Sequence, residues 1–150
     1  MVSSGNRRDG QPAIVNPNAA STKPKRLSFD QKIFEEKWLQ KLIDSNPELL
    51  PVTEIEPAFA PLVSVGLEIE TGVGFIDNLF ISPQGYLTMA ETKLWRNHEA
   101  RREVVSQIID YAAAVSHWTF EQLESKVRDY NKQYRGSDLG ILDSLRLIQI

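Results

Sequence analysis

The segment Pro83-Gln84-Gly85 separates two apolar stretches, and it constrains the fold more than any other feature of the chain. Proline and glycine around a polar residue are typical of a hairpin turn. The flanking stretches, 74–82 and 86–94, have the composition of strands. We therefore expect two strands that pair as a hairpin about this turn.

The rest of the chain predicts one further strand and several helices. Residues 62–70 form the expected first strand, and Gly72 and Gly74 mark the turn after it. A helix is expected from an N-cap at Ser28 to Asn46-Pro47, because proline disfavours helical geometry at the preceding residue. Apolar residues at helical spacing return after the strands, at Val104, Ile108, Tyr111, Val115 and Trp118. Further helices are expected at 120–132 and, in part, at 138–150. This order predicts an α/β fold of the α+β sandwich type, with a meander flanked by helices.

Length and charge distribution predict one domain with a basic tail. The chain has 150 residues, the size of one ordinary domain. Residues 1–26 are polar, carry a net charge of +4 against −3 for the whole chain, and show no hydrophobic period. We expect this tail to be disordered, either without a role or as an arm for a phosphate backbone. The domain would cover 27–150, with a C-terminal end that is compatible with truncation.

Composition excludes several classes of site and location. The chain has no cysteine, which rules out disulfides and thiolate metal sites, and it has only two histidines. Any metal must then bind oxygen ligands, which favours a hard ion such as Mg²⁺. No apolar run approaches the roughly 18 residues of a membrane span, and no signal-peptide core begins the chain. We therefore expect a cytoplasmic protein without a membrane partner.

Asp77 is the first of two anomalies in the predicted strands. Side chains alternate between the two faces of a strand, so Asp77 shares a face with Phe75, Leu79 and Ile81. An acidic residue thus interrupts a row of large apolar residues. A purely structural strand gains nothing from this arrangement.

Glu91 and Lys93 are the second anomaly. They end a row that begins with Leu87 and Met89 on the facing strand. Counting outward from Gln84 places Asp77 and Glu91 seven residues away on either side, and therefore opposite each other. Two facing carboxylates repel, and a divalent cation removes the repulsion. The alternative is a solvated edge with a weak salt bridge and an exposed acid, but the coincidence of the three residues favours a functional site.

These residues resemble the signature of the PD-(D/E)xK nuclease superfamily. Ile76-Asp77 followed by Glu91-Thr92-Lys93 is similar to its core motif, with isoleucine in the place of proline. Gln107 and Tyr111 resemble the Q-x-x-x-Y motif of the RecB-like branch, including its small uncharacterised bacterial members. The resemblance covers roughly residues 30–125. It implies a restriction-endonuclease-like core, with a mixed β-sheet flanked by helices.

The resemblance also implies roles for the motif residues in a Mg²⁺- or Mn²⁺-dependent deoxyribonuclease. Asp77 and Glu91 would bind the metal, together with the backbone carbonyl of Thr92. Lys93 would orient the attacking water or stabilise negative charge in the transition state, for which a compact ammonium group is suited. Glu36 would match an acid that some members place beside the metal, although a solvated role is equally compatible with its charged neighbours.

Several other residues are candidates for supporting roles. Glu68 is a candidate for an additional acid on the metal side. Gln107 and Tyr111 lie four residues apart and share a helix face, so they could contact the nucleic-acid backbone or support the site. Spacing alone is also compatible with a core role for Tyr111. Arg101 and Arg102 could hold phosphate or belong to a solvated helix face.

Three functions remain open on the sequence alone. The leading hypothesis is hydrolysis of phosphodiester bonds in DNA, with RNA as a further candidate substrate. The alternatives are a non-catalytic nucleic-acid-binding or assembly module with the nuclease fold, and a structural subunit with acids only on its surface. The intact set of Asp77, Glu91 and Lys93 favours the enzyme. A homodimer or a larger complex is compatible with the family analogy.

Overall fold

The structure, a computed structural model, describes residues 14–15, 21–22, 35–93 and 100–147. The chain divides into two compact units, Met1–Ile33 and Phe34–Ile150. In the first unit, strands β1 (Ile14–Val15) and β2 (Ser21–Thr22) pair in antiparallel orientation. The expected N-cap Ser28 and most of the tail predicted to be disordered lie outside the described residues. Disorder of residues 1–26 therefore stays a prediction.

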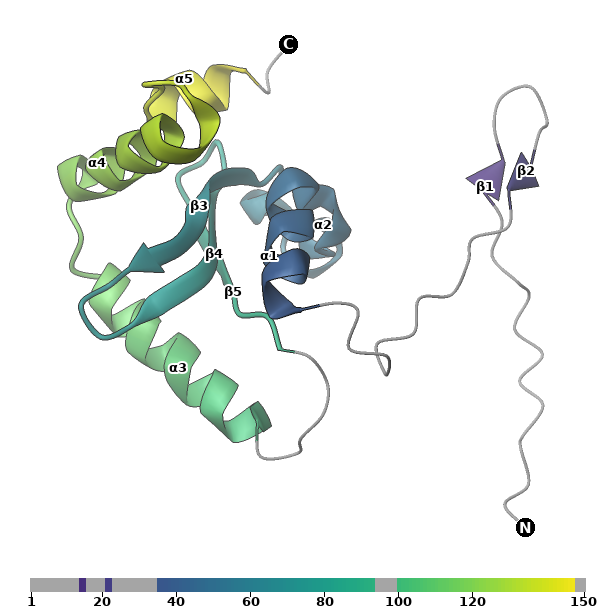
Figure 1. The fold of residues 1–150 in the computed structure, drawn as a ribbon, viewed down its shortest axis with the longest axis horizontal. Helices are drawn as coiled ribbons and strands as arrows, with labels where there is room; N and C mark the ends of the chain where they lie inside the picture. The colour runs from purple at the N-terminus through teal and green to yellow at the C-terminus, as the bar shows by residue number, and fades with distance from the viewer. Residues whose placement is uncertain (1–13, 16–20, 23–34, 94–99, 148–150) are drawn as a thin grey trace. The chain divides into compact units, whose positions relative to one another are not determined.

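The second unit contains a three-stranded antiparallel sheet in the order β3-β4-β5 (Figure 1). The strands are β3 (Val63–Glu70), β4 (Phe75–Ile81) and β5 (Leu87–Ala90). The α+β class and the meander are confirmed, but the expected mixed sheet is wrong for the described strands. The physical reason is that each connection is a short turn that reverses the chain, whereas a parallel pair needs a long crossover.

Backbone hydrogen bonds in the turn between β4 and β5 set the end of β4 and the start of β5. The amide of Gly85 donates to the carbonyl of Ser82 over 2.9 Å, and the amide of Ser82 donates to the carbonyl of Tyr86 over 2.9 Å. These bonds confirm the hairpin turn predicted from Pro83-Gln84-Gly85. The third strand is shorter than predicted, because β5 ends at Ala90 instead of continuing to position 94.

Helices precede and follow the sheet. Their bounds are α1 Glu36–Ser45, α2 Val52–Ile55, α3 Ala100–Val115, α4 Phe120–Tyr130 and α5 Ile141–Arg146. Single turns or irregular helical segments lie at Pro47–Leu49 (η2), Pro57–Phe59 (η3) and Asn131–Arg135 (η4, a π-helix). The predicted end of the first helix before Pro47 is confirmed. Within the described part of the chain, no helix is long and apolar enough to cross a membrane.

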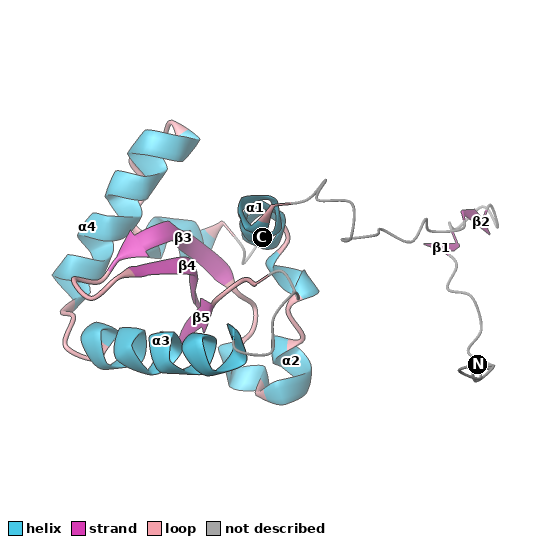
Figure 2. Cartoon of the chain, turned by 60° about the horizontal axis from the view of Figure 1, so that its bottom comes forward, coloured by secondary structure: helices cyan, strands magenta, loops and turns pink. Residues whose placement is uncertain are grey.

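Both faces of the central strand are covered from Asn78 to Ile81, where its residues are buried. Leu79 and Ile81 belong to an apolar cluster with residues of α3, α4 and α5, whereas the Asn78 amide donates to the Gln40 carbonyl of α1 over 2.9 Å. Helices α1 and α3 accordingly lie on opposite sides of the sheet (Figure 2). The predicted alternation along β4 is confirmed at these positions.

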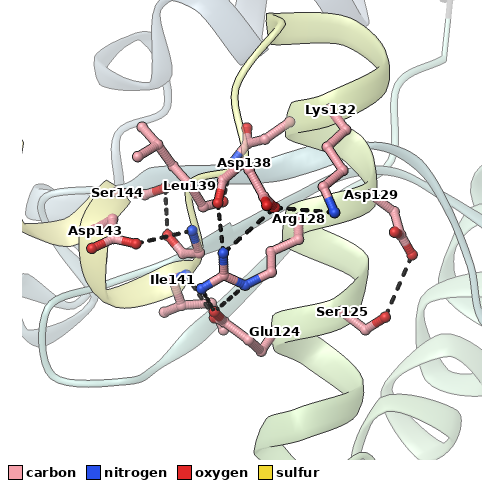
Figure 3. Close-up of polar contacts among 12 residues, drawn as sticks. Glu124, Ser125, Arg128, Asp129, Lys132, Asp138, Leu139, Ile141, Asp143 and Ser144 are labelled. Atoms are coloured by element: carbon pink, nitrogen blue, oxygen red, sulfur yellow. Dashed lines mark hydrogen bonds and ion pairs between the residues drawn. The ribbon is translucent and has the colours of Figure 1, made fainter.

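A network of charged side chains connects α5 to α4 (Figure 3). The Glu124 carboxylate accepts from the Ile141 amide over 2.7 Å, at the start of α5, and pairs with Arg128 over 2.8 Å. Arg128 also donates to the Asp138 carbonyl over 2.6 Å. The Glu124 contact satisfies the Ile141 amide at the start of α5, which would otherwise lack a partner.

Gly140→Ala is expected to disrupt this network. A Cβ at position 140 would overlap Glu124 Oε1 and lie 2.7 Å from a terminal nitrogen of Arg128. We expect a loss of about 1 kcal/mol in the free energy of unfolding, since the Glu124 carboxylate, which accepts from Arg128 through Oε1 and from the Ile141 amide through Oε2, must shift. Urea denaturation measures this change. Ser137→Ala, in the same loop, serves as the control; equal stability of both variants and the wild type would contradict the proposed crowding.

A second polar network joins the end of α4 to α1 and β3. Asp44 accepts hydrogen bonds from the hydroxyl of Ser64 and, over 3.2 Å, from Arg135 Nη2. The Tyr130 hydroxyl lies 3.5 Å from the same carboxylate. Burial, followed by the negative charge of Asp44, raises the pKa of Tyr130 to about 12.

Stability is therefore expected to fall at alkaline pH because of Tyr130. Between the ordinary tyrosine pKa of about 10 and its folded pKa of about 12, the unfolded chain has released the proton and the folded chain retains it. The contribution is complete below pH ~10 and is lost as pH rises through pH ~12, amounting to roughly 2–3 kcal/mol. Urea denaturation of wild type and Tyr130→Phe from pH 8 to pH 11.5 measures it. Parallel declines in the two proteins would contradict this prediction.

Candidate functional site

The register of β4 and β5 brings Asp77 and Glu91 together. Asn78 of β4 pairs with Ala90 of β5, and the same register continued by one residue sets Asp77 opposite Glu91. The register is the one predicted by counting outward from Gln84. The two acids therefore lie just beyond the end of β5 at Ala90.

Asp77 is held in place by Thr92. Its Oδ2 atom accepts a hydrogen bond from the backbone amide of Thr92 over 2.7 Å and another from the threonine hydroxyl over 2.8 Å. Thr92 itself is buried. Two hydrogen bonds fix the orientation of the carboxylate and engage one of its oxygens. The sequence prediction concerned the Thr92 carbonyl, and the structure adds the amide and hydroxyl as positioning groups.

Glu91 is a buried acid with one paired oxygen. Its Oε1 lies 3.0 Å from Lys93 Nζ, and only 4% of its side chain is exposed. Its Oε2 is buried and, among the described residues, has no hydrogen-bond partner. Burial raises the pKa of Glu91, the hydrogen bond from Lys93 opposes this change, and the charges of Asp77 and Glu36 add to it. An additional cation at this point would stabilise the ionised form.

Lys93 lies on the side of the site that faces solvent. One third of its side chain is exposed (33%), whereas its ammonium group reaches inward to Glu91. Burial alone would lower the pKa of Lys93, but the hydrogen bond to Glu91 and the charges of Glu91, Glu36 and Asp77 outweigh it and raise the pKa. The lysine is therefore a permanent positive charge at neutral pH, as its proposed charge-stabilising role requires.

Tyr111 joins the site from α3. It is buried, and its ring packs so closely on Gly74 that a Cβ there would lie 2.9 Å from the tyrosine hydroxyl. Burial raises the pKa of Tyr111, and the negative charges of Glu91 and Asp77 raise it further. The structure thus gives Tyr111 both a packing role and a position in the electrostatic field of the acids.

Gln107 lies one helical turn before Tyr111. Its Oε1 atom is buried and, within the described residues, has no hydrogen-bond partner. Buried acceptors without partners are uncommon and call for an explanation. Gln107 therefore remains a candidate for a supporting role on this face of α3.

The remaining predicted residues differ in their relation to the site. Glu36, at the start of α1, acts electrostatically on both Glu91 and Lys93 and so lies near them. Glu68 does not join them: it adopts a positive φ of 49° and pairs with Lys37 over 3.6 Å. Its neighbours Leu67 and Ile69 pair with Asn78 and Ile76, so β3 continues through Glu68 although this residue has a left-handed conformation.

Among the described contacts, none joins Arg101 or Arg102 to the site. Arg102 is exposed on α3. The side chain of Arg101 lies outside the described residues. Their proposed contact with phosphate therefore stays a prediction.

The donor set fits a divalent cation of the Mg²⁺ type. Mg²⁺ is commonly held by one or two carboxylates together with water and substrate phosphate. Asp77 and Glu91 supply two carboxylates, and the buried Glu91 Oε2 has no hydrogen-bond partner among the described residues. Within the described ranges, no group of three or more histidine, cysteine, aspartate or glutamate residues has the geometry of a metal site. Any cation here would therefore depend on two carboxylates and on non-protein oxygens.

Two contributors to the site were not found by sequence reasoning. Asn78 carries the bond that positions α1, and therefore Glu36, against the sheet. The hydroxyl of Thr92 fixes Asp77. A buried-strand asparagine beside a candidate acid was the available signal for Asn78, whereas the bend that turns Thr92 toward Asp77 has no signature in the strand pattern.

Comparisons with known protein families, with curated proteins and with solved structures found no match for the chain. Functional assignment consequently depends on the chemistry of the side chains described above. The strongest parts of that chemistry are the facing Asp77 and Glu91 and the lysine that accompanies them.

Proposed function

We propose that this chain is a divalent-metal-dependent nuclease that hydrolyses phosphodiester bonds of DNA, with a restriction-endonuclease-like core. The observation that carries the proposal is the meeting of Asp77 and Glu91, with one buried Glu91 oxygen left without a partner among the described residues. An isolated structural sheet would avoid this arrangement, since a buried acceptor and two adjacent acids both cost free energy. Binding of a cation offsets both costs.

The proposed chemistry divides between the cation and the protein. When bound, Mg²⁺ or Mn²⁺ neutralises phosphate charge and lowers the pKa of water. Asp77 and Glu91 hold it, and Thr92 keeps Asp77 in a fixed orientation. Lys93 directs a positive charge toward the phosphate oxygens or the attacking water, from the exposed side of the pair. The protein therefore supplies ligands, orientation and one fixed charge.

Residues around this centre have proposed supporting roles. Tyr111 limits the flexibility of the Gly74 turn before β4, and Glu36 adjusts the local charge. Gln107 offers a buried acceptor on α3. Arg102 is exposed and can approach a phosphate backbone. DNA is the proposed partner, RNA is a further candidate, and the cytoplasm is the proposed location.

A non-catalytic nucleic-acid-binding or assembly module is the second candidate function. It is favoured by the absence, among the described residues, of a three-ligand metal group. It is also compatible with Lys93 Nζ lying 3.0 Å from Glu91, where the lysine itself compensates the acid. In this case the protein would bind nucleic acid equally well with Mg²⁺ or with EDTA and would leave it intact.

Incubation with defined substrates distinguishes the two functions. Purified protein is mixed with single-stranded, duplex and supercoiled DNA and with RNA, each with Mg²⁺ or with EDTA. The nuclease proposal predicts products in Mg²⁺, none in EDTA, and none from Asp77→Asn in either condition. Binding without cleavage of any substrate would support the non-catalytic module.

A further inference from the structure

A cavity of about 330 Å³ opens beside α1, on a part of the surface to which the proposed chemistry assigns no role. Its walls come from α1, from β3 and from the end of α4 and η4. The lining residues used below are Lys41, Asp44, Glu68, Tyr130 and Tyr134. This volume is within the range of small-ligand pockets and is sufficient for one nucleotide base.

Two tyrosines form an aromatic wall of the cavity. The rings of Tyr130 and Tyr134 have centroids 4.9 Å apart and planes inclined by 38°. Tyr130 is buried, whereas Tyr134 is 63% exposed. The buried ring therefore lies against an outer ring that is largely exposed to solvent. Such a supported, open ring is the element that stacks on bases in single-strand-binding proteins.

The charges around the cavity leave a net positive contribution from Lys41. Asp44 is neutralised by Arg135, whose Nη2 lies 3.2 Å from it, and Glu68 is paired with Lys37. Lys41 is exposed, and among the described residues it has no ion-pair partner. An anion at the cavity mouth would meet this lysine without facing an uncompensated carboxylate.

The cavity adjoins the proposed metal centre through two elements. On α1, the charge of Glu36 raises the pKa of Glu91. Gln40, also on α1, lines the cavity, and its backbone carbonyl accepts a hydrogen bond from the side chain of Asn78. On β3, Glu68 lines the cavity, and its neighbours Leu67 and Ile69 pair with Asn78 and Ile76 of β4. Helix α1 therefore contributes both to the wall of the cavity and to the charges around Glu91.

We propose that this cavity binds one unpaired nucleotide of a single-stranded nucleic acid, with its base stacked on Tyr134 and its phosphate near Lys41. The choice of nucleic acid as the ligand rests on the proposed nuclease function. A base in a duplex already has both faces stacked, so the cavity selects a single strand or a base extruded from a duplex. The proposal thus adds a preference for single strands to the proposed nuclease function.

Binding of a fluorescent single strand tests the role of Tyr134. An oligonucleotide with one 2-aminopurine is titrated in EDTA, so that no cleavage occurs, with wild type, Tyr134→Ala and Tyr134→Phe. Stacking quenches the 2-aminopurine. We expect quenching with wild type and Tyr134→Phe, and a loss of quenching with about tenfold or weaker binding for Tyr134→Ala. Phe120→Ala, which removes another exposed aromatic side chain, should bind as wild type does.

Salt dependence tests the role of Lys41. The slope of log K against log salt is negative, and removing one phosphate contact from a single-strand complex makes it less steep by about 0.7. Lys41→Ala should show this less steep slope. Arg146→Ala, which removes one positive charge from α5, should not. Circular dichroism checks that all variants retain the helical signal of wild type.

Defined outcomes overturn the inference. It fails if the wild type does not bind the single strand, if Tyr134→Ala binds and quenches as wild type does, or if a duplex of the same sequence binds equally well. Cleavage in Mg²⁺ with unaltered binding by Tyr134→Ala would reject the cavity and keep the nuclease. Binding that depends on Tyr134 without cleavage would reject the nuclease and keep the cavity.

Discussion

Lys93→Ala is expected to lower kcat for phosphodiester cleavage by about 10²–10³-fold, the usual effect of removing one transition-state donor. KM and metal affinity should change little, because Asp77 and Glu91 remain as ligands. The expected loss follows from the position of the ammonium group, 3.0 Å from Glu91 and partly exposed to an incoming phosphate. Single-turnover cleavage with saturating Mg²⁺ measures it.

A purely structural role for Lys93 would give a different result. If the lysine only keeps Glu91 ionised, its removal raises the pKa of Glu91, since burial already shifts that pKa upward. The acid limb of the pH–rate profile would then move to higher pH, and the rate would recover on its plateau. A rate that stays low at every pH supports transition-state stabilisation, and full recovery contradicts it. Lys126→Ala is the charge-matched control.

Asn78→Asp is expected to lower the free energy of unfolding at pH 7 by about 3–5 kcal/mol, the cost of leaving a buried charge uncompensated. Asn78 has no solvent exposure, and its amide donates to the Gln40 carbonyl. An ionised aspartate would set an acceptor against that carbonyl, beside Asp77. Urea denaturation measures the change.

The pH dependence of this variant separates the effect of charge from that of a lost hydrogen bond. Burial raises the pKa of the introduced acid, so its destabilisation begins above the unfolded pKa of about 4 and grows as pH rises. At lower pH the protonated acid can donate to Gln40, and stability should recover relative to wild type. Asn78→Leu lacks the charge and should show a loss that does not vary with pH. Equal losses in both variants at pH 7 and pH 4.5 would contradict this account.

The turns and the strand register could be predicted because their determinants are local. Proline and glycine fix the turn at 83–85, and the two-residue period then determines which side chains share a face. Counting outward from Gln84 was sufficient to set Asp77 opposite Glu91. The end of α1 before Pro47 follows from the same kind of local steric rule.

Features that depend on distant contacts could not be predicted in this way. Asp44 meets Tyr130 and Arg135 across 86 and 91 residues of chain, and no periodic pattern reports such a meeting. Glu68 has a positive φ within β3, and spacing gave no indication of it. The prediction of a mixed sheet rested on a family resemblance, whereas the described strands of the sheet are antiparallel.

Calorimetric titration with Mn²⁺ tests most directly the central claim that Asp77 and Glu91 together hold a divalent cation. The proposal predicts saturable binding to wild type, and affinity reduced by at least about tenfold in Asp77→Asn and in Glu91→Gln. Asp110→Asn, which removes an exposed acid from α3, should bind as wild type does. Absence of binding to wild type, or equal affinities in all four proteins, would contradict the claim.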